Sequence, residues 1–114
     1  MSPADLDDVL LALSDPVRRA VIARLREGPC RAGEMASELN LAPPSMSKHL
    51  RVLRRGGLIE ERRIEEDARV RLYALRREPF LALHEWLAHV EEFWSEQLGS
   101  FERQVRKRKR GGKR

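Results

Sequence analysis

The chain has 114 residues, of which 41% are hydrophobic and 36% are charged. This length suits one domain with a small core beneath a charged surface and leaves no room for two full cores. Charges interrupt every apolar stretch before it approaches the ~18 residues of a membrane helix. The acidic start lacks the basic and apolar regions of a signal peptide. A single cysteine excludes an internal disulfide framework. We therefore expect a cytoplasmic protein with no membrane contact.

The net charge of +5 is distributed unevenly along the chain. Residues 103–114 hold eight basic and no acidic residues, and residues 43–77 hold ten basic against five acidic ones. Residues 1–15 and 78–102 carry acidic residues and no Lys or Arg. This pattern is typical of a protein that presents one face to a polyanion, although solvated surface charge alone would also produce it.

The first half of the chain has the periodicity of helices. Apolar residues at i, i+3, i+4 and i+7 predict a short amphipathic helix over 5–13. Asp15 can cap a second helix of about 16–26, whose first residue is a proline. A third short helix over 31–39 and a tight turn precede a fourth helix, 43–55, which two prolines open.

After a pair of glycines the pattern changes from helical to alternating. Residues 58–64 and 69–75 predict two strands, and the polar stretch 65–68 between them predicts a hairpin loop. A long helix over 79–104 follows. We expect the basic tail, 105–114, to form a flexible arm together with the two residues before it, because it has too little apolar surface to fold alone and its like charges repel one another. The alternatives are a nuclear-import-like basic run and an extension of the last helix that a dimer partner orders.

Two short helices joined by a tight turn, the second of them basic, are typical of a helix-turn-helix that binds DNA. On helix 43–55 an apolar face, Met46, Leu50 and Leu53, would pack against helix 31–39. All charges on the other face are positive, whereas a helix that docks onto a protein would show apolar or mixed residues. Small hydroxyls permit close approach to base edges, and Lys and Arg reach guanine acceptors or phosphates. The candidate contacts on this face are Pro44, Ser47, Lys48, Arg51, Arg54 and Arg55.

Four short motifs follow one another in register along the chain. They are L-x-D-P-x-R-R from Leu13, E-x-A-x-x-L from Glu34, S-x-S-K-H-L from Ser45 and L-x-x-x-G-L-I from Leu53. With them, residues 5–104 resemble the ArsR/SmtB family of bacterial repressors. The resemblance implies a winged helix-turn-helix, mainly α with a small β-hairpin, that forms a homodimer through its first and last helices. It also adds Ser45 and His49 to the candidate DNA contacts.

The chain departs from the family pattern at the start of helix 43–55 and in the wing. Ala42 stands where an N-capping Ser or Thr is usual, and Pro43 and Pro44 replace polar residues that often contact DNA. The wing tip is acidic where the family has Gly and Arg. The expected wing contacts are Arg62, Arg63, Arg69 and Arg71 at its flanks, unless the wing contacts DNA only weakly.

Residues that could bind a metal are few. The thiolate pair that relatives carry on the third helix is missing, because Cys30 is the only cysteine. Glu78, His89 and Glu92 keep the spacing of the zinc site on the last helix of other relatives, but Arg76 occupies the first ligand position and its charge opposes a cation. We therefore expect no metal and no cofactor, and the effector stays unknown.

Apolar residues recur every three or four positions along helix 79–104, which predicts the seam of paired helices. Its aromatic surface exceeds what a body of this size needs to cover, so a homodimer is favoured over a monomer with a core helix. The expected dimer contacts are Leu6, Leu10 and Leu13 in the first helix, and Leu83, Trp86, Leu87, Val90, Phe93, Trp94 and Phe101 in the last.

The sequence thus favours a dimeric repressor that binds a palindromic operator in double-stranded DNA with helix 43–55 in the major groove. Two alternatives remain: a winged helix used for protein docking, and a non-specific nucleic-acid binder driven by the basic tail. An enzyme is not expected, because the chain has no Gly-rich phosphate loop and no credible Ser–His–Asp or Cys–His pattern.

Overall fold

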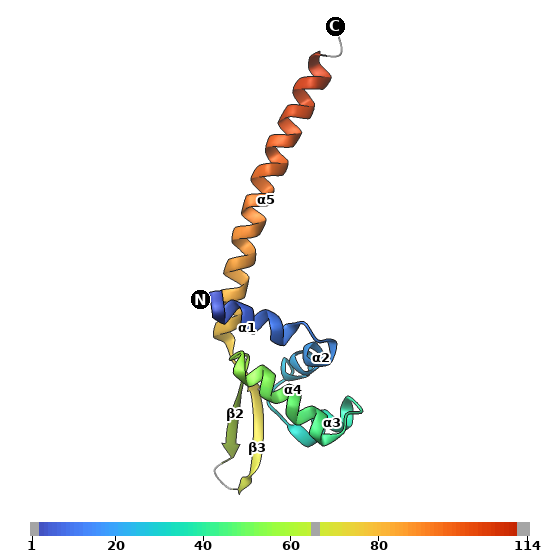
Figure 1. The fold of residues 1–114 in the computed structure, drawn as a ribbon, viewed down its shortest axis with the longest axis vertical. Helices are drawn as coiled ribbons and strands as arrows, with labels where there is room; N and C mark the ends of the chain where they lie inside the picture. Colours follow the sequence, from blue (N-terminus) through green and yellow to red (C-terminus); the bar gives the residue numbers. More distant parts are fainter. Residues whose placement is uncertain (1–2, 65–66, 112–114) are drawn as a thin grey trace. The chain divides into compact units, whose positions relative to one another are not determined.

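A computed structural model describes residues 3–64 and 67–111, in two units divided after Leu81. The first unit contains α1 (Pro3–Leu13), α2 (Pro16–Leu25), β1 (Cys30–Arg31), α3 (Ala32–Glu38), α4 (Pro43–Arg55), β2 (Ile59–Ile64) and β3 (Asp67–Leu75), as Figure 1 shows. Helix α5 (Arg77–Gly111) begins in the first unit and makes up the described part of the second. Within the described residues, no helix is both long and apolar enough to cross a bilayer.

The four short helices lie close to their predicted positions, and the predicted limits of α4 are confirmed at both ends. The structure adds a strand that the sequence did not predict. Strand β1 pairs antiparallel with β3, Cys30 opposite Tyr73, so that the sheet has the order β1-β3-β2. A two-residue strand is too short to show alternation, and only its partner makes it recognisable.

Strand β3 begins at Asp67, earlier than predicted, so part of the predicted loop 65–68 belongs to the wing strand. Strand β2 ends at Ile64, as predicted, and its pairing with β3 shifts register between Arg63 and Ile64. Residues 65 and 66 lie outside the described part of the chain.

Helix α5 continues through the basic segment to Gly111, which corrects the prediction of a flexible tail from residue 105. Gln, Arg and Lys are good helix formers, and Glu102 precedes Arg106 by one turn, a spacing that favours opposite charges. These local preferences outweigh the like-charge repulsion on which the prediction rested. Residues 112–114 lie outside the description.

The core of the first unit is entirely apolar among the residues described. Its buried members are Val9, Ala12, Val21, Leu25, Cys30, Met35, Ala36, Met46, Leu50, Leu53, Leu58, Ile59 and Ala74. The predicted inward face of α4 is therefore confirmed, and burying it leaves the charged face of that helix in water.

Asp15 caps α2 as predicted. Its Oδ1 accepts hydrogen bonds from the backbone N–H groups of Val17 (2.8 Å) and Arg18 (3.2 Å), and Pro16 occupies the first helical position. Burial alone would raise the pKa of Asp15, but these N–H groups and the Arg18 charge outweigh it. The pKa of Asp15 therefore lies below its usual value.

The last carbonyl groups of a helix lack hydrogen-bond partners within the helix. At the end of α1, two arginines donate hydrogen bonds to these groups. The guanidinium of Arg18 donates to the carbonyl oxygens of Ala12 (2.7 Å) and Leu11 (2.9 Å). Arg19 donates to the carbonyl oxygen of Leu13 (2.9 Å). The L-x-D-P-x-R-R motif thus ends one helix and begins the next.

The lowered pKa of Asp15 predicts a pH dependence of stability. Ionised Asp15 stabilises the fold fully above its usual pKa of 3.8, and this contribution is lost as the pH falls through the lower pKa of the folded state. Asp15→Asn keeps a capping oxygen but does not titrate. The amount by which its free energy of unfolding falls below that of the wild type should therefore shrink as the pH falls from about 7 to about 2. Asp15→Ala should be less stable than both at neutral pH. Urea denaturation across this range measures the deficits, and a deficit for Asp15→Asn that does not change with pH would contradict the assignment.

Candidate nucleic-acid interface

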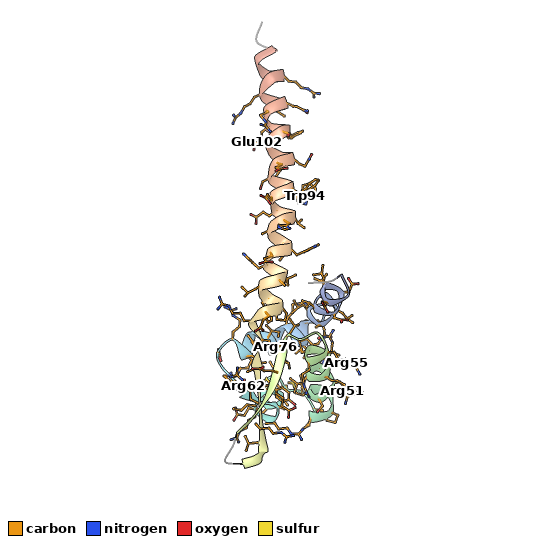
Figure 2. All side chains as sticks on the ribbon, turned by 90° about the vertical axis from the view of Figure 1, so that its left-hand side faces the viewer. Arg51, Arg55, Arg62, Arg76, Trp94 and Glu102 are labelled. Atoms are coloured by element: carbon orange, nitrogen blue, oxygen red, sulfur yellow. The ribbon has the colours of Figure 1, made fainter. Side chains whose placement is uncertain are left out.

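Helix α4 places its apolar and basic side chains on opposite faces. Its exposed residues include Pro44, Ser45, Ser47, Lys48, Arg51, Arg54 and Arg55, which are most of the predicted contacts. Figure 2 shows Arg51 and Arg55 projecting from the same side of the helix, as a separation of four residues requires. The arrangement brings small hydroxyls and long cations onto one surface that is open to a ligand.

The start of α4 has no side-chain cap, as Ala42 predicts. Pro43 and Pro44 occupy the first two helical positions and have no N–H group, so two of the four unpaired donors at a helix start do not exist here. The missing cap therefore costs little. The first turn of α4 is free of a capping side chain and carries Ser45 exposed at its surface.

A tight turn fixes α4 against α3. Asn40 adopts a left-handed conformation (φ 53°), which Asn tolerates better than most residues, and the N–H of Leu41 donates to the carbonyl of Ala36 (2.8 Å). Arg24 of α2 ties the other side of α3 through a 2.7 Å hydrogen bond from its Nε to Glu38. Both contacts fix the C-terminal end of α3, the helix that precedes α4.

One carboxylate of the wing joins two of the predicted DNA-binding arginines. Glu61 Oε2 on β2 lies 3.2 Å from Arg54 Nη1 on α4, and its Oε1 lies 3.1 Å from Arg71 Nε on β3. The contact with Arg71 is an ion pair without the direction of a hydrogen bond. The Glu61 side chain is only 15% exposed, and a carboxylate so covered needs such partners. Sequence reasoning missed Glu61, because alternation along a strand does not show which side chains meet across elements.

The remaining wing arginines differ in their surroundings. Arg62 and Arg63 are both exposed, but Arg62 pairs with Glu60, with 2.9 Å between Nη2 and Oε1. The side chain of Arg69 lies outside the described residues. The wing therefore offers cations, but acidic neighbours on its own strand hold part of them.

His49 faces the body of the first unit more than the other candidates do. Its side chain is half-buried, and its Nδ1 lies 3.5 Å from Arg18 Nη1. By contrast, Lys48, Arg51 and Arg55 form no ion pair with any side chain that the structure describes. These three cations of α4 are the ones available to an anionic partner.

A shallow hollow of about 200 Å³ adjoins this surface. Its lining residues are Ala32, Ser47, Leu50, Arg51, Arg54 and Tyr73. It brings α3, α4 and β3 together around Ser47 and two arginines, so the candidate surface is a concave one rather than a single convex helix.

The candidate metal ligands are not gathered into a site. Among the described residues no three His, Cys, Asp or Glu side chains come together, and Glu78 is paired with the competing cation, Arg76, at 3.8 Å. Burial raises the pKa of the Cys30 thiol, and Glu34, 3.5 Å from its Sγ, adds to the effect. A buried protonated thiol is a poor ligand and a poor nucleophile.

Comparison with known proteins gives the family. Residues 13–62 match the family described as a helix-turn-helix domain. Over 90 residues the chain is 33% identical to the HTH-type transcriptional regulator Rv2034 of Mycobacterium tuberculosis, covering 79% of this chain and 78% of that protein. The crystal structure of an ArsR family transcriptional regulator matches with a TM-score of 0.74 and 39% identity, over 83% of this chain and 95% of that one. The chain belongs to the ArsR family.

Membership of this family confirms the predicted winged helix-turn-helix, and it identifies the chain as a DNA-binding regulator of transcription rather than an enzyme. A further relative, the transcriptional repressor SdpR of Bacillus subtilis, is 36% identical over 58 residues. That match covers 51% of this ArsR-family chain and 64% of SdpR, so the chain spans less than two thirds of that relative.

The Glu61 bridge predicts how DNA binding depends on salt. Glu61→Gln removes the charge that competes with DNA phosphates for Arg54 and Arg71, and each phosphate newly neutralised should steepen the slope of log affinity against log salt by about 0.9. The variant should therefore bind DNA more tightly at low salt and lose more affinity as salt is added. Fluorescence anisotropy with a labelled duplex measures the slope.

Glu27→Gln is the matched control, because it removes one carboxylate from an exposed pair with Arg24, which is not a candidate DNA contact. Its slope should stay close to that of the wild type. Equal slopes for Glu61→Gln and the wild type would show that the bridge does not compete with DNA.

Proposed function

We propose that this protein is a dimeric repressor that binds a palindromic operator with α4 in the major groove. The observation that carries the proposal is the exposed face of α4, on which Lys48, Arg51 and Arg55 have no ion-pair partner among the described residues. Repression is supported by relatives, among them SdpR and the biofilm growth-associated repressor of Xylella fastidiosa.

The proposed roles follow from position along α4. Ser45 and Ser47, on the first turns, are short enough to let the backbone approach base edges. Lys48 and Arg51 lie one turn further and reach guanine acceptors in the groove. Arg55, at the end of the helix, reaches the phosphate backbone, which positions the protein without reading sequence.

The first test is the contrast between Lys48 and Arg55. Lys48→Ala should cost about 1–3 kcal/mol on the operator and relax specificity at one position per half-site, because a base contact is lost. Arg55→Ala, the matched control, should weaken binding to all sequences alike. Binding of each variant to the operator and to its single-base variants measures both effects. A uniform loss for Lys48→Ala would make that residue a phosphate contact.

Truncation of the basic end of α5 distinguishes operator binding through α4 from non-specific binding through that basic end. Removing residues 103–114 takes away eight cations, which should flatten the salt slope and weaken specific and non-specific binding by similar factors. The footprint of the protein on DNA should remain. Affinity that becomes independent of sequence at raised salt would instead favour the non-specific alternative.

The homodimer is supported by apolar surface left in water. Large hydrophobic side chains of α5 are 44–64% exposed, and Figure 2 shows Trp94 projecting from the helix. The exposed members are Leu81, Trp86, Leu87, Phe93, Trp94, Leu98 and Phe101 on α5, with Leu10 and Leu11 on α1. Exposed apolar side chains that recur along one helix mark an interaction site, and a second copy of the chain would cover those of α5 by pairing along the apolar seam.

A charge on this seam tests the dimer. Trp94→Glu should give monomers or aggregates, because an unpaired carboxylate within an apolar interface costs several kcal/mol. Glu96→Lys, two residues further on the same helix but outside the predicted seam, should leave the dimer intact. Light scattering at micromolar concentration measures the mass, and a monomeric wild-type protein would refute the dimer.

A further inference from the structure

A second hollow lies on the first unit, apart from the α4 surface. It has a volume of about 330 Å³ and is lined by Ile22, Arg26, Leu75, Arg76, Arg77 and Phe80. These residues come from α2 and the residue that ends it, the end of β3 and the first turn of α5. The volume lies within the range of roughly 300–1,000 Å³ that is usual for small-molecule pockets.

The lining of this hollow has two kinds of side chain. Ile22, Leu75 and Phe80 are half-buried and apolar, and no neutral polar side chain lines the space. The three arginines add aliphatic stems, because arginine covers apolar surface with its stem while its guanidinium stays in water. An occupant therefore needs an apolar body, and the only polar partners for it are guanidinium groups at the edge.

The arginines at the edge differ in availability. Arg76 lies 3.8 Å from Glu78, whose charge offsets part of its own (Figure 2 labels Arg76). Arg26 and Arg77 are exposed and take part in no ion pair within the part of the chain that the structure describes. Two free cations beside an apolar hollow complement an anion attached to an apolar group, and a guanidinium binds a carboxylate through two parallel hydrogen bonds.

We propose that this hollow binds a small molecule with an apolar body and one terminal carboxylate. The body lies against Ile22, Leu75 and Phe80, and the carboxylate is held by Arg26 and Arg77. The site is separate from the DNA-binding surface, so its existence does not depend on the role proposed for α4.

Octanoate is the probe, and octan-1-ol, which has the same chain without the charge, is its neutral counterpart. Calorimetric titration of the full-length protein should show octanoate binding at one equivalent per chain and octan-1-ol binding at least ten-fold more weakly. Amide shifts in a ¹H–¹⁵N spectrum should concentrate at residues around Ile22, Leu75 and Phe80. Equal binding of the two probes, or no binding of octanoate at millimolar concentration, would overturn the proposal.

Exposed arginines also provide matched variants that should fold normally. The double variant Arg26→Ala/Arg77→Ala should weaken octanoate binding at least ten-fold, whereas Arg31→Ala/Arg63→Ala, which removes two exposed arginines elsewhere, should leave it unchanged. Equal losses in the two variants would mean that only net charge matters and would overturn the site. Binding that appears only when Trp94→Glu dissociates the protein would also overturn it, because a second copy would then occupy the hollow.

Discussion

The guanidinium of Arg18 is the contact on which the arrangement of the helices depends. It donates to two carbonyls at the end of α1, lies 3.9 Å from the Asp15 carboxylate that caps α2, and lies 3.5 Å from His49 on α4. Several donors in one rigid plane allow a single side chain to meet three elements at once, which an ammonium group could not do with the same directions. The half-buried side chain of Arg18 thus connects α4 to the two helices that precede α3.

Ion pairing, rather than the net charge, determines which cations of this protein are available to an anion. Glu61 holds Arg54 and Arg71, Glu60 holds Arg62, and other cations remain without such partners among the residues described. The acidic side chains of the wing therefore limit which arginines of the wing and of α4 meet an anion. The acidic wing departs from the family pattern, yet it is consistent with α4 as the principal contact.

Helix α5 differs in charge and in exposed apolar surface along its length. Its first two thirds are acidic and carry exposed aromatic side chains, and its end is basic and still helical. In the proposed dimer, this apolar surface would supply the attraction, and repulsion between like charges would disfavour other pairings of the helix.

The sequence by itself determined the features that depend on neighbouring residues. The limits and inward face of α4, the Asp15 cap and the missing cap at Ala42 all follow from side chains within a turn or two of one another, because helix ends and faces are local properties. Only the tertiary structure decided the pairing of Cys30 with Tyr73, the Glu61 bridge and the hollow beside Phe80. Each of these joins segments far apart along the chain, and periodicity within one segment carries no information about which distant side chain it will meet.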